Sequence, residues 1–186
     1  MAFRIKKFIL FSFNLTDMKK IFITGISGSG KSTLAKKLAS IHNIPHFDLD
    51  DVFWVKKYSE KRSDDDCIIK LKKILSQNKS WIIEGTYGWT KFAADKADLV
   101  IWLNFGINLS TYRVIKRWIG RKGDDKENLK ELYGLIKYVR AYHKIRPNKI
   151  CSIFDAHKEI VSKNKHNLIE ITNKKQLKKL LEESVC

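Results

Sequence analysis

Short apolar runs alternate with amphipathic segments along the chain from residue 20 onward. The runs are nearly continuously apolar and rich in β-branched and aromatic residues, which is typical of strands covered on both faces. We predict strands at 20–24, 45–50, 81–85, 98–104 and 167–171. The remaining segments space their apolar residues as helices do. We predict helices at 33–41, 63–77, 108–120, 127–145, 148–162 and 173–183. The expected fold is therefore α/β, with a parallel sheet of about five strands between helices.

The loop after the first predicted strand, from Gly25 to Ser32, fits the phosphate-binding pattern G-x-x-x-x-G-K-[ST] at each fixed position. Glycines let a backbone approach phosphates closely, and loop amides followed by a helix N-terminus attract anions. We expect Lys31 to contact the β- and γ-phosphates of ATP and the Ser32 hydroxyl to contact Mg²⁺. The predicted nucleotide-binding residues are Gly25, Ser27, Gly28, Ser29, Gly30, Lys31, Ser32 and Thr33.

The second predicted strand ends with Asp48 and Asp50, and the third ends with Glu84. Because ligands of parallel sheets bind beyond the carboxyl ends of the strands, we expect Asp50 and Glu84 near the γ-phosphate. We interpret Asp50 as the base or ligand for a phosphate acceptor, and Glu84 as a ligand of the acceptor or of the Mg²⁺ water shell. The alternative for Asp50 is a loop carboxylate that caps Val52 or Phe53. For Glu84 the alternative is an ordinary acidic residue at a strand end.

Arginines concentrate in one part of the sequence, whereas lysines are spread over all of it. Arg113, Arg117 and Arg121 are spaced four residues apart, so they share one helical face. Arginine suits bidentate contact with phosphate. We therefore expect these three residues to stabilise a transferring phosphoryl group, with a mobile lid around 120–126 that excludes water. The alternative is a solvated basic stripe.

The net charge of +17 predicts anionic partners without distinguishing nucleotide, nucleic acid and anionic lipid. The three cysteines are far apart and match no metal or redox spacing, so we expect reduced thiols and a cytoplasmic location. Residues 1–17 carry a short apolar run behind basic residues, and we expect an extension of a single domain at 18–186, or a natural start at Met18. We expect no membrane span.

Four segments in this order, GISGSGKST, FDLDDVFW, WIIEGTY and TYRVIKRWIGR, resemble the adenylate-kinase-related P-loop kinases identified as DNA topology modulation proteins. The resemblance covers roughly residues 19–147 and more loosely the last strand and helix. It implies a three-layer P-loop NTPase fold like that of nucleoside monophosphate kinases, with a short lid, ATP and Mg²⁺. It also implies that Asp50, Trp54 and Tyr87 match family residues after the second and third strands, and that Arg113 and Arg117 match basic residues near the lid.

Three positions depart from that pattern. Glu84 stands where an aspartate is usual and Thr86 where an asparagine is usual. Asn104 stands at the end of the fourth strand, where many P-loop proteins carry an aspartate. These departures concern the chemistry at the acceptor more than nucleotide binding.

The function we favour is transfer of the γ-phosphate of Mg-ATP to a small acceptor, either nucleoside-like, nucleotide-like or another hydroxyl compound. One alternative is a nucleic-acid-binding NTPase, in which lysines contact the phosphate backbone and aromatic side chains stack on bases. The aromatic candidates are Trp54, Tyr58, Trp89 and Trp118. Another alternative is a regulatory nucleotide-binding protein without transfer activity, which Asn104 would permit. The sequence leaves the oligomeric state open.

Overall fold

The computed structural model describes residues 18–56, 60–120, 128–145 and 153–185. Its main sheet has five parallel strands in the order β2-β5-β1-β6-β7. The strands are β1 (Lys20–Gly25), β2 (His46–Asp48), β5 (Trp81–Glu84), β6 (Leu99–Leu103) and β7 (Leu168–Ile171). All five predicted strands are present, and the α/β prediction is confirmed.

The strand that precedes the glycine-rich loop lies at the centre of the sheet. β1 pairs with β5 on one side, where Ile23 is opposite Glu84, and with β6 on the other, where Gly25 is opposite Leu103. β2 pairs with the outer edge of β5. Because all strands are parallel, the loop after β1 lies next to the carboxyl ends of β5 and β2.

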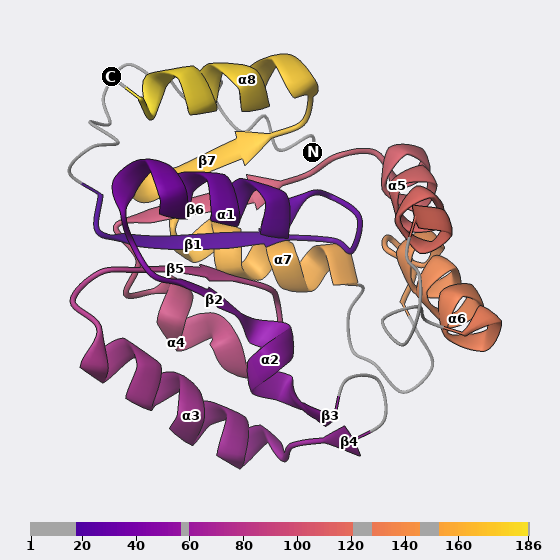
Figure 1. Ribbon diagram of the computed structural model, residues 1–186, viewed down its shortest axis with the longest axis horizontal. Helices are drawn as coiled ribbons and strands as arrows, with labels where there is room; N and C mark the ends of the chain where they lie inside the picture. The colour runs from indigo at the N-terminus through magenta and orange to yellow at the C-terminus, as the bar shows by residue number, and fades with distance from the viewer. Residues whose placement is uncertain (1–17, 57–59, 121–127, 146–152, 186) are drawn as a thin grey trace.

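Helices cover both faces of the sheet and give three layers (Figure 1). One face carries α1 (Lys31–His42) and α8 (Lys174–Glu183); the other carries α3 (Asp64–Gln77), α4 (Lys91–Ala94) and α7 (Ile153–Lys163). Leu38 and Leu180 are buried against the first face, and Leu71 and Ile160 against the second. The three-layer prediction is therefore confirmed.

Two further helices, α5 (Ile107–Gly120) and α6 (Leu129–Arg140), pack on each other beyond the carboxyl ends of the strands (Figure 1). Ile26 of the glycine-rich loop is 2% exposed and packs among residues of this pair, including Val114 and Leu132. Tyr142, which follows α6, belongs to the same cluster. The loop is therefore anchored from its apolar side by helices that come much later in the sequence.

Several short elements differ from the sequence predictions. The segment after β2, expected to be a loop, forms α2 (Leu49–Phe53) and an antiparallel hairpin of β3 (Trp54–Lys56) and β4 (Glu60–Lys61). A 3₁₀ turn, η3 (Gly88–Thr90), precedes α4, and another, η5 (Lys165–Asn167), precedes β7. Elements of two to five residues are too short to show a hydrophobic period, so tertiary contacts decide them.

The predicted helix starts are largely confirmed. Ser63 accepts a hydrogen bond from the Asp66 amide at the start of α3, so the aspartates there form a first turn that favours the helix dipole. The helix expected at 127–145 ends at Arg140. The expected extension at 1–17 and lid residues 121–126 lie outside the described residues. Within the described ranges, no helix combines the length and apolar character needed to cross a membrane.

Candidate active site

The loop between β1 and α1 adopts a backbone that its glycines permit. Gly25 and Gly28 have φ of 145° and 80°. A Cβ on Gly25 would lie 2.6 Å from the carbonyl oxygen of Leu103, and one on Gly28 would lie 2.3 Å from that of Ser110. The loop therefore lies directly against β6 and α5, and a larger residue at either glycine would displace it.

The N-terminus of α1 lacks a capping side chain. Its N-cap residue, Gly30, makes no side-chain cap, and its first turn holds no acidic residue. By contrast, Asp48, Ser63 and Asn128 accept backbone hydrogen bonds at the starts of α2, α3 and α6. The first-turn amides of α1 and the positive end of its dipole are therefore suited to an external anion. This arrangement fits a phosphate group of a nucleotide.

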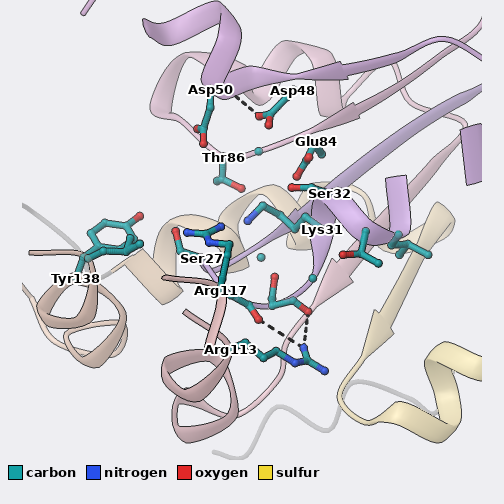
Figure 2. Close-up of a pocket in the computed structure, with 18 of the residues that line it drawn as sticks. Ser27, Lys31, Ser32, Asp48, Asp50, Glu84, Thr86, Arg113, Arg117 and Tyr138 are labelled. Atoms are coloured by element: carbon teal, nitrogen blue, oxygen red, sulfur yellow. Dashed lines mark hydrogen bonds between the residues drawn. The ribbon is translucent and has the colours of Figure 1, made fainter. Parts of the chain in front are cut away.

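Lys31 lies between the loop and the carboxylates of the neighbouring strands (Figure 2). Its Nζ donates to the carbonyl oxygen of Ile26 at 3.3 Å. Burial lowers the pKa of Lys31, although the charges of Glu84 and Asp50 oppose the shift. A partly desolvated ammonium gains from an anion placed beside it. The Lys31 side chain is therefore placed to gain from phosphate binding.

Glu84 lies at the end of β5, next to Ser32 in the first turn of α1 (Figure 2). Its side chain is 2% exposed, and His46 Nε2 lies 3.5 Å from Glu84 Oε1. Burial raises the pKa of Glu84, but contacts with His46 and Ser32 and the charge of Lys31 outweigh it and hold the pKa below its ordinary value. Glu84 is therefore ionised at neutral pH beside the serine expected to contact Mg²⁺.

Asp48 is the register partner of Glu84 across β2 and β5. Residues opposite each other on parallel strands point to the same face, so the two carboxylates are neighbours. Burial and the charge of Glu84 raise the pKa of Asp48 to about 6, against a lowering contribution from the Asp50 amide. Asp48, the last residue of β2, is not among the site residues predicted from the sequence.

The carboxylate of Asp50 is held by Tyr87, whose hydroxyl donates to Asp50 Oδ1 at 2.5 Å. Tyr87 stacks between Phe53 and Trp89, with ring centroids 4.6 and 5.1 Å apart. Burial and the charge of Asp50 raise the pKa of Tyr87, so it stays a phenol and a donor. The capping alternative for Asp50 is wrong, because Asp48 caps α2 by accepting from the Asp50 amide at 2.9 Å.

Two of the predicted arginines reach the loop from α5. Arg113 Nη1 donates to the carbonyl oxygen of Ser29 at 2.9 Å, and the guanidinium lies 4.8 Å from the Phe105 ring centroid. Arg113 therefore positions the loop. Arg117, one turn later, lines the same space, and its charge contributes to the lowered pKa of Lys31. Arg121 lies outside the described residues.

These groups line one cavity of about 1100 Å³ (Figure 2). What we call the loop end consists of Gly25, residues 27–33, Arg113 and Arg117. What we call the acidic end consists of Asp48, Asp50, Phe53, Trp54, Lys61, Glu84, Thr86 and Tyr87. Every predicted site residue within the described ranges lines this cavity.

Two lining residues that the sequence analysis missed, Tyr138 and His157, come from α6 and α7. His157 is 1% exposed, and its Nδ1 lies 2.9 Å from the Tyr142 hydroxyl. Burial, assisted by the charge of Lys31, lowers the pKa of His157 to about 3, so it is neutral. Neither residue carries a local sequence signal, since only the packing of α6 and α7 brings them to the loop.

Comparisons with known proteins identify the family to which the chain belongs. A family model described as AAA domain (AAA_18) matches residues 21–131, more than half of the chain. The chain belongs to this family. Uncharacterized protein YqaC of Bacillus subtilis (strain 168) is 32% identical over 108 residues, which are 58% of this chain and 61% of that protein. A cytidylate kinase of Haloarcula marismortui is 30% identical over 114 residues, 52% and 57% of the two chains.

The AAA-domain chain thus spans about three fifths of the length of these curated relatives. A gluconokinase from Sinorhizobium meliloti 1021 superposes with a TM-score of 0.53 at 12% identity, covering 90% of this chain and 89% of the gluconokinase. At that identity the likeness shows the fold alone. Together these matches show the AAA-domain family and the three-layer α/β fold of P-loop kinases, while the narrower DNA topology modulation group stays a resemblance.

The residues of this AAA domain fit a magnesium ion held mainly by a nucleotide. Within the described ranges, no three His, Cys, Asp or Glu side chains are grouped so that they could hold a metal on their own. Magnesium keeps several waters and binds through substrate phosphates with one or two protein groups. The Ser32 hydroxyl beside the ionised, buried Glu84 supplies two such groups at the first turn of α1.

Asn104 turns out to lie away from the cavity of this AAA domain. Its amide donates to Glu170 Oε1 at 2.8 Å, between the ends of β6 and β7, and it is not among the lining residues. The acidic strand end next to the loop belongs to β5 instead, at Glu84. Asn104 therefore does not mark a missing catalytic carboxylate, and the regulatory alternative loses the observation that permitted it.

The aromatic residues considered for base stacking differ in their burial and in the part of the fold that they contact. Trp89 is 8% exposed and packs on Tyr87, so its ring is not presented to solvent. Trp118 is half-buried in the α5–α6 cluster. Trp54 lines the cavity, and Tyr58 lies outside the described residues. The described residues Trp54, Trp89 and Trp118 therefore occupy three different environments.

Proposed function

We propose that this protein is an ATP-dependent small-molecule kinase. The observation that carries the proposal is that one cavity joins a phosphate-binding loop to a set of carboxylates on the neighbouring strands. Nucleotide binding accounts for the loop end, whereas Asp48 and Asp50 at the acidic end suit a second substrate. The cavity of about 1100 Å³ exceeds the roughly 300–1,000 Å³ typical of a single small-molecule site, which supports room for two ligands.

At the loop end, the first-turn amides of α1 and the ammonium of Lys31 would bind the β- and γ-phosphates of ATP. Arg117 would offset charge that develops on the transferring group, and Arg113 would keep the loop in shape through the Ser29 carbonyl. Ser32 and Glu84 would hold Mg²⁺ directly or through water. When bound, the ion neutralises phosphate charge and orients the γ-phosphate.

At the acidic end, Asp50 would accept the proton of the attacking hydroxyl. A bond then forms between the acceptor oxygen and the γ-phosphorus, the bond between the γ-phosphorus and the bridging oxygen breaks, and ADP leaves. The Tyr87 hydroxyl fixes the Asp50 carboxylate, and Asp48 adds negative charge that orients the acceptor. Because phosphoryl transfer depends mainly on positioning, a modest base in a fixed place is sufficient.

The test is transfer of labelled γ-phosphate from ATP to members of a panel of nucleosides, nucleotides and sugars, with Mg²⁺ present. We expect a labelled acceptor with the natural protein and none with Lys31→Ala. Lys36→Ala is the matched control, because Lys36 is exposed on the same helix and does not line the cavity. Label released only as inorganic phosphate, with every acceptor, would refute transfer in favour of hydrolysis.

A further inference from the structure

We infer that the phosphate acceptor is an uncharged compound with several hydroxyl groups, and that anionic acceptors are rejected. This inference deepens the proposed function and rests on it. It depends on the charges, hydrogen-bonding groups and ring faces of the acidic end, which are described in turn below.

The acidic end presents hydrogen-bond acceptors to a ligand. Asp48, Asp50 and Glu84 line it with carboxylate oxygens, and the register pairing of Asp48 with Glu84 places two of these side chains next to each other. The Oε1 atom of Glu84 is buried, and His46 Nε2 lies 3.5 Å from it. Ionised carboxylates accept hydrogen bonds and cannot donate them. Their ligand must therefore supply donors, as hydroxyl groups do.

Two cations beside this end, Arg62 and Lys61, are engaged by the protein itself, whereas Lys31, between the two ends, is the residue assigned to the phosphates of ATP. Arg62 Nη1 donates to the carbonyl oxygens of Val52 and Trp54 at 2.8 and 2.6 Å, and so supports the turn from α2 into β3. Lys61 Nζ lies over the rings of Phe53 and Trp54, 5.8 and 5.4 Å from their centroids. The described acidic end thus lacks the arginine fork that typically receives a phosphate or carboxylate group.

The wall beside the carboxylates is aromatic. Phe53, Trp54 and Tyr87 line the cavity, and Phe53 packs edge-on against Trp54 at 5.0 Å and face-on against Tyr87. Ring faces next to carboxylates suit a compound that offers an apolar face and an edge of hydroxyl groups. Free sugars and cyclic polyols have this chemistry, and so do nucleosides.

An anionic acceptor would meet like charge at this end. A phosphate or carboxylate group of the acceptor would be repelled within a few ångströms of Asp48 and Asp50. The same repulsion would keep the hydroxyl groups of an anionic acceptor from donating to the two carboxylates. We expect kcat/KM to be higher for neutral acceptors than for their anionic counterparts by about tenfold or more. Each nearby carboxylate repels the anionic acceptor and so adds to this difference.

The experiment compares matched neutral and anionic acceptors in the labelled-ATP assay. Glucose and inositol are set against gluconate and a sugar phosphate, and adenosine and cytidine against their monophosphates. Turnover of the sugars and polyols, or of the nucleosides, identifies which of these two classes of compound is the acceptor. Preference for the anionic members, with transfer intact, would overturn the acceptor inference and leave the kinase proposal standing. Absence of transfer to every compound, with ATP binding intact, would overturn the kinase proposal itself.

A charge-neutral substitution gives an independent readout of the same inference. In Asp48→Asn the N-cap of α2 is kept, because asparagine caps helices about as well as aspartate. We expect the preference for neutral over anionic acceptors to fall by about threefold or more. Asp51→Asn is the matched control, since Asp51 is the neighbouring exposed carboxylate and does not line the cavity. An unchanged preference in Asp48→Asn, or an equal change in Asp51→Asn, would contradict the inference.

Discussion

Replacing Asp48 by asparagine should make the protein more stable at neutral pH while impairing the site. In the folded protein the Asp48 carboxylate is partly buried beside Glu84, its register partner on β5, and near Asp50. Asparagine keeps the hydrogen bond that caps α2 and removes the charge that burial and repulsion disfavour. The substitution therefore separates the contribution of Asp48 to stability from its contribution to acceptor binding.

The magnitude follows from the pKa. Burial and the Glu84 charge raise the pKa of Asp48 from 3.8 to about 6. Without solvent screening, this difference corresponds to a loss of about 3 kcal/mol in the free energy of unfolding when Asp48 is ionised. Asp48 is only partly buried, so solvent screening reduces this to about 1.5 kcal/mol. Loss of a negative charge at the N-terminus of α2 costs roughly 0.5 kcal/mol. We expect a net gain of about 1 kcal/mol, or about 2–4 °C in Tm for a chain of this size.

The pH dependence gives the sharper test. Because the folded pKa of Asp48 is above the unfolded value, proton binding favours the folded state. The wild type therefore recovers stability relative to the variant as pH falls from about 6 to 3.8. Urea unfolding followed by tryptophan fluorescence should give the variant the higher free energy of unfolding at about pH 8. The difference between variant and wild type should be smaller at about pH 5. The reasoning fails if Asp48→Asn is less stable at pH 8, or if Asp51→Asn gives the same gain.

Three further substitutions test the rest of the site. Lys31→Ala should abolish ATP binding by calorimetry and change the free energy of unfolding by less than about 1 kcal/mol, whereas Lys36→Ala should bind normally. Asp50→Asn should lower kcat by about 10²–10⁴-fold with unchanged affinity for ATP; weakened ATP binding would argue against its place at the acceptor. Gly28→Ala should destabilise the fold by more than about 1 kcal/mol, since its φ is 80° and a Cβ would lie 2.3 Å from a carbonyl oxygen of α5. Gly88→Ala, where a Cβ meets nothing within 4 Å, is its control in thermal unfolding.

The strands and the loop could be predicted because their patterns are local. A continuous apolar run such as 99–103 is sufficient to predict a buried strand, and the glycine and lysine spacing at 25–32 predicts a phosphate loop. Parallel topology then places Asp50 and Glu84 at the same edge of the sheet. The structure brings both residues to the cavity, as the sequence analysis expected.

What could not be predicted depends on contacts between distant segments. The pKa of Asp48 is raised by burial and by the charge of Glu84, its register partner on a strand more than thirty residues later. His157 reaches the loop only because α7 packs against the second face of the sheet. The contacts of Arg113 with the Phe105 ring and the Ser29 carbonyl oxygen likewise join α5 to segments far from it in the sequence. None of these relations has a signature within a single segment.

The order of the strands decides which acidic residue can serve the loop. Both strands that pair with β1 end beside a polar residue, β5 at Glu84 and β6 at Asn104. Glu84 is buried beside the first turn of α1 and next to Asp48, so its charge acts on Lys31 and Ser32. Asn104 is instead bonded to Glu170 on the other flank of the sheet. Because β2 also pairs with β5 and not with β6, the strand-end carboxylates Asp48 and Glu84 lie together on one side of the loop, and that asymmetry gives the cavity its separate loop end and acidic end.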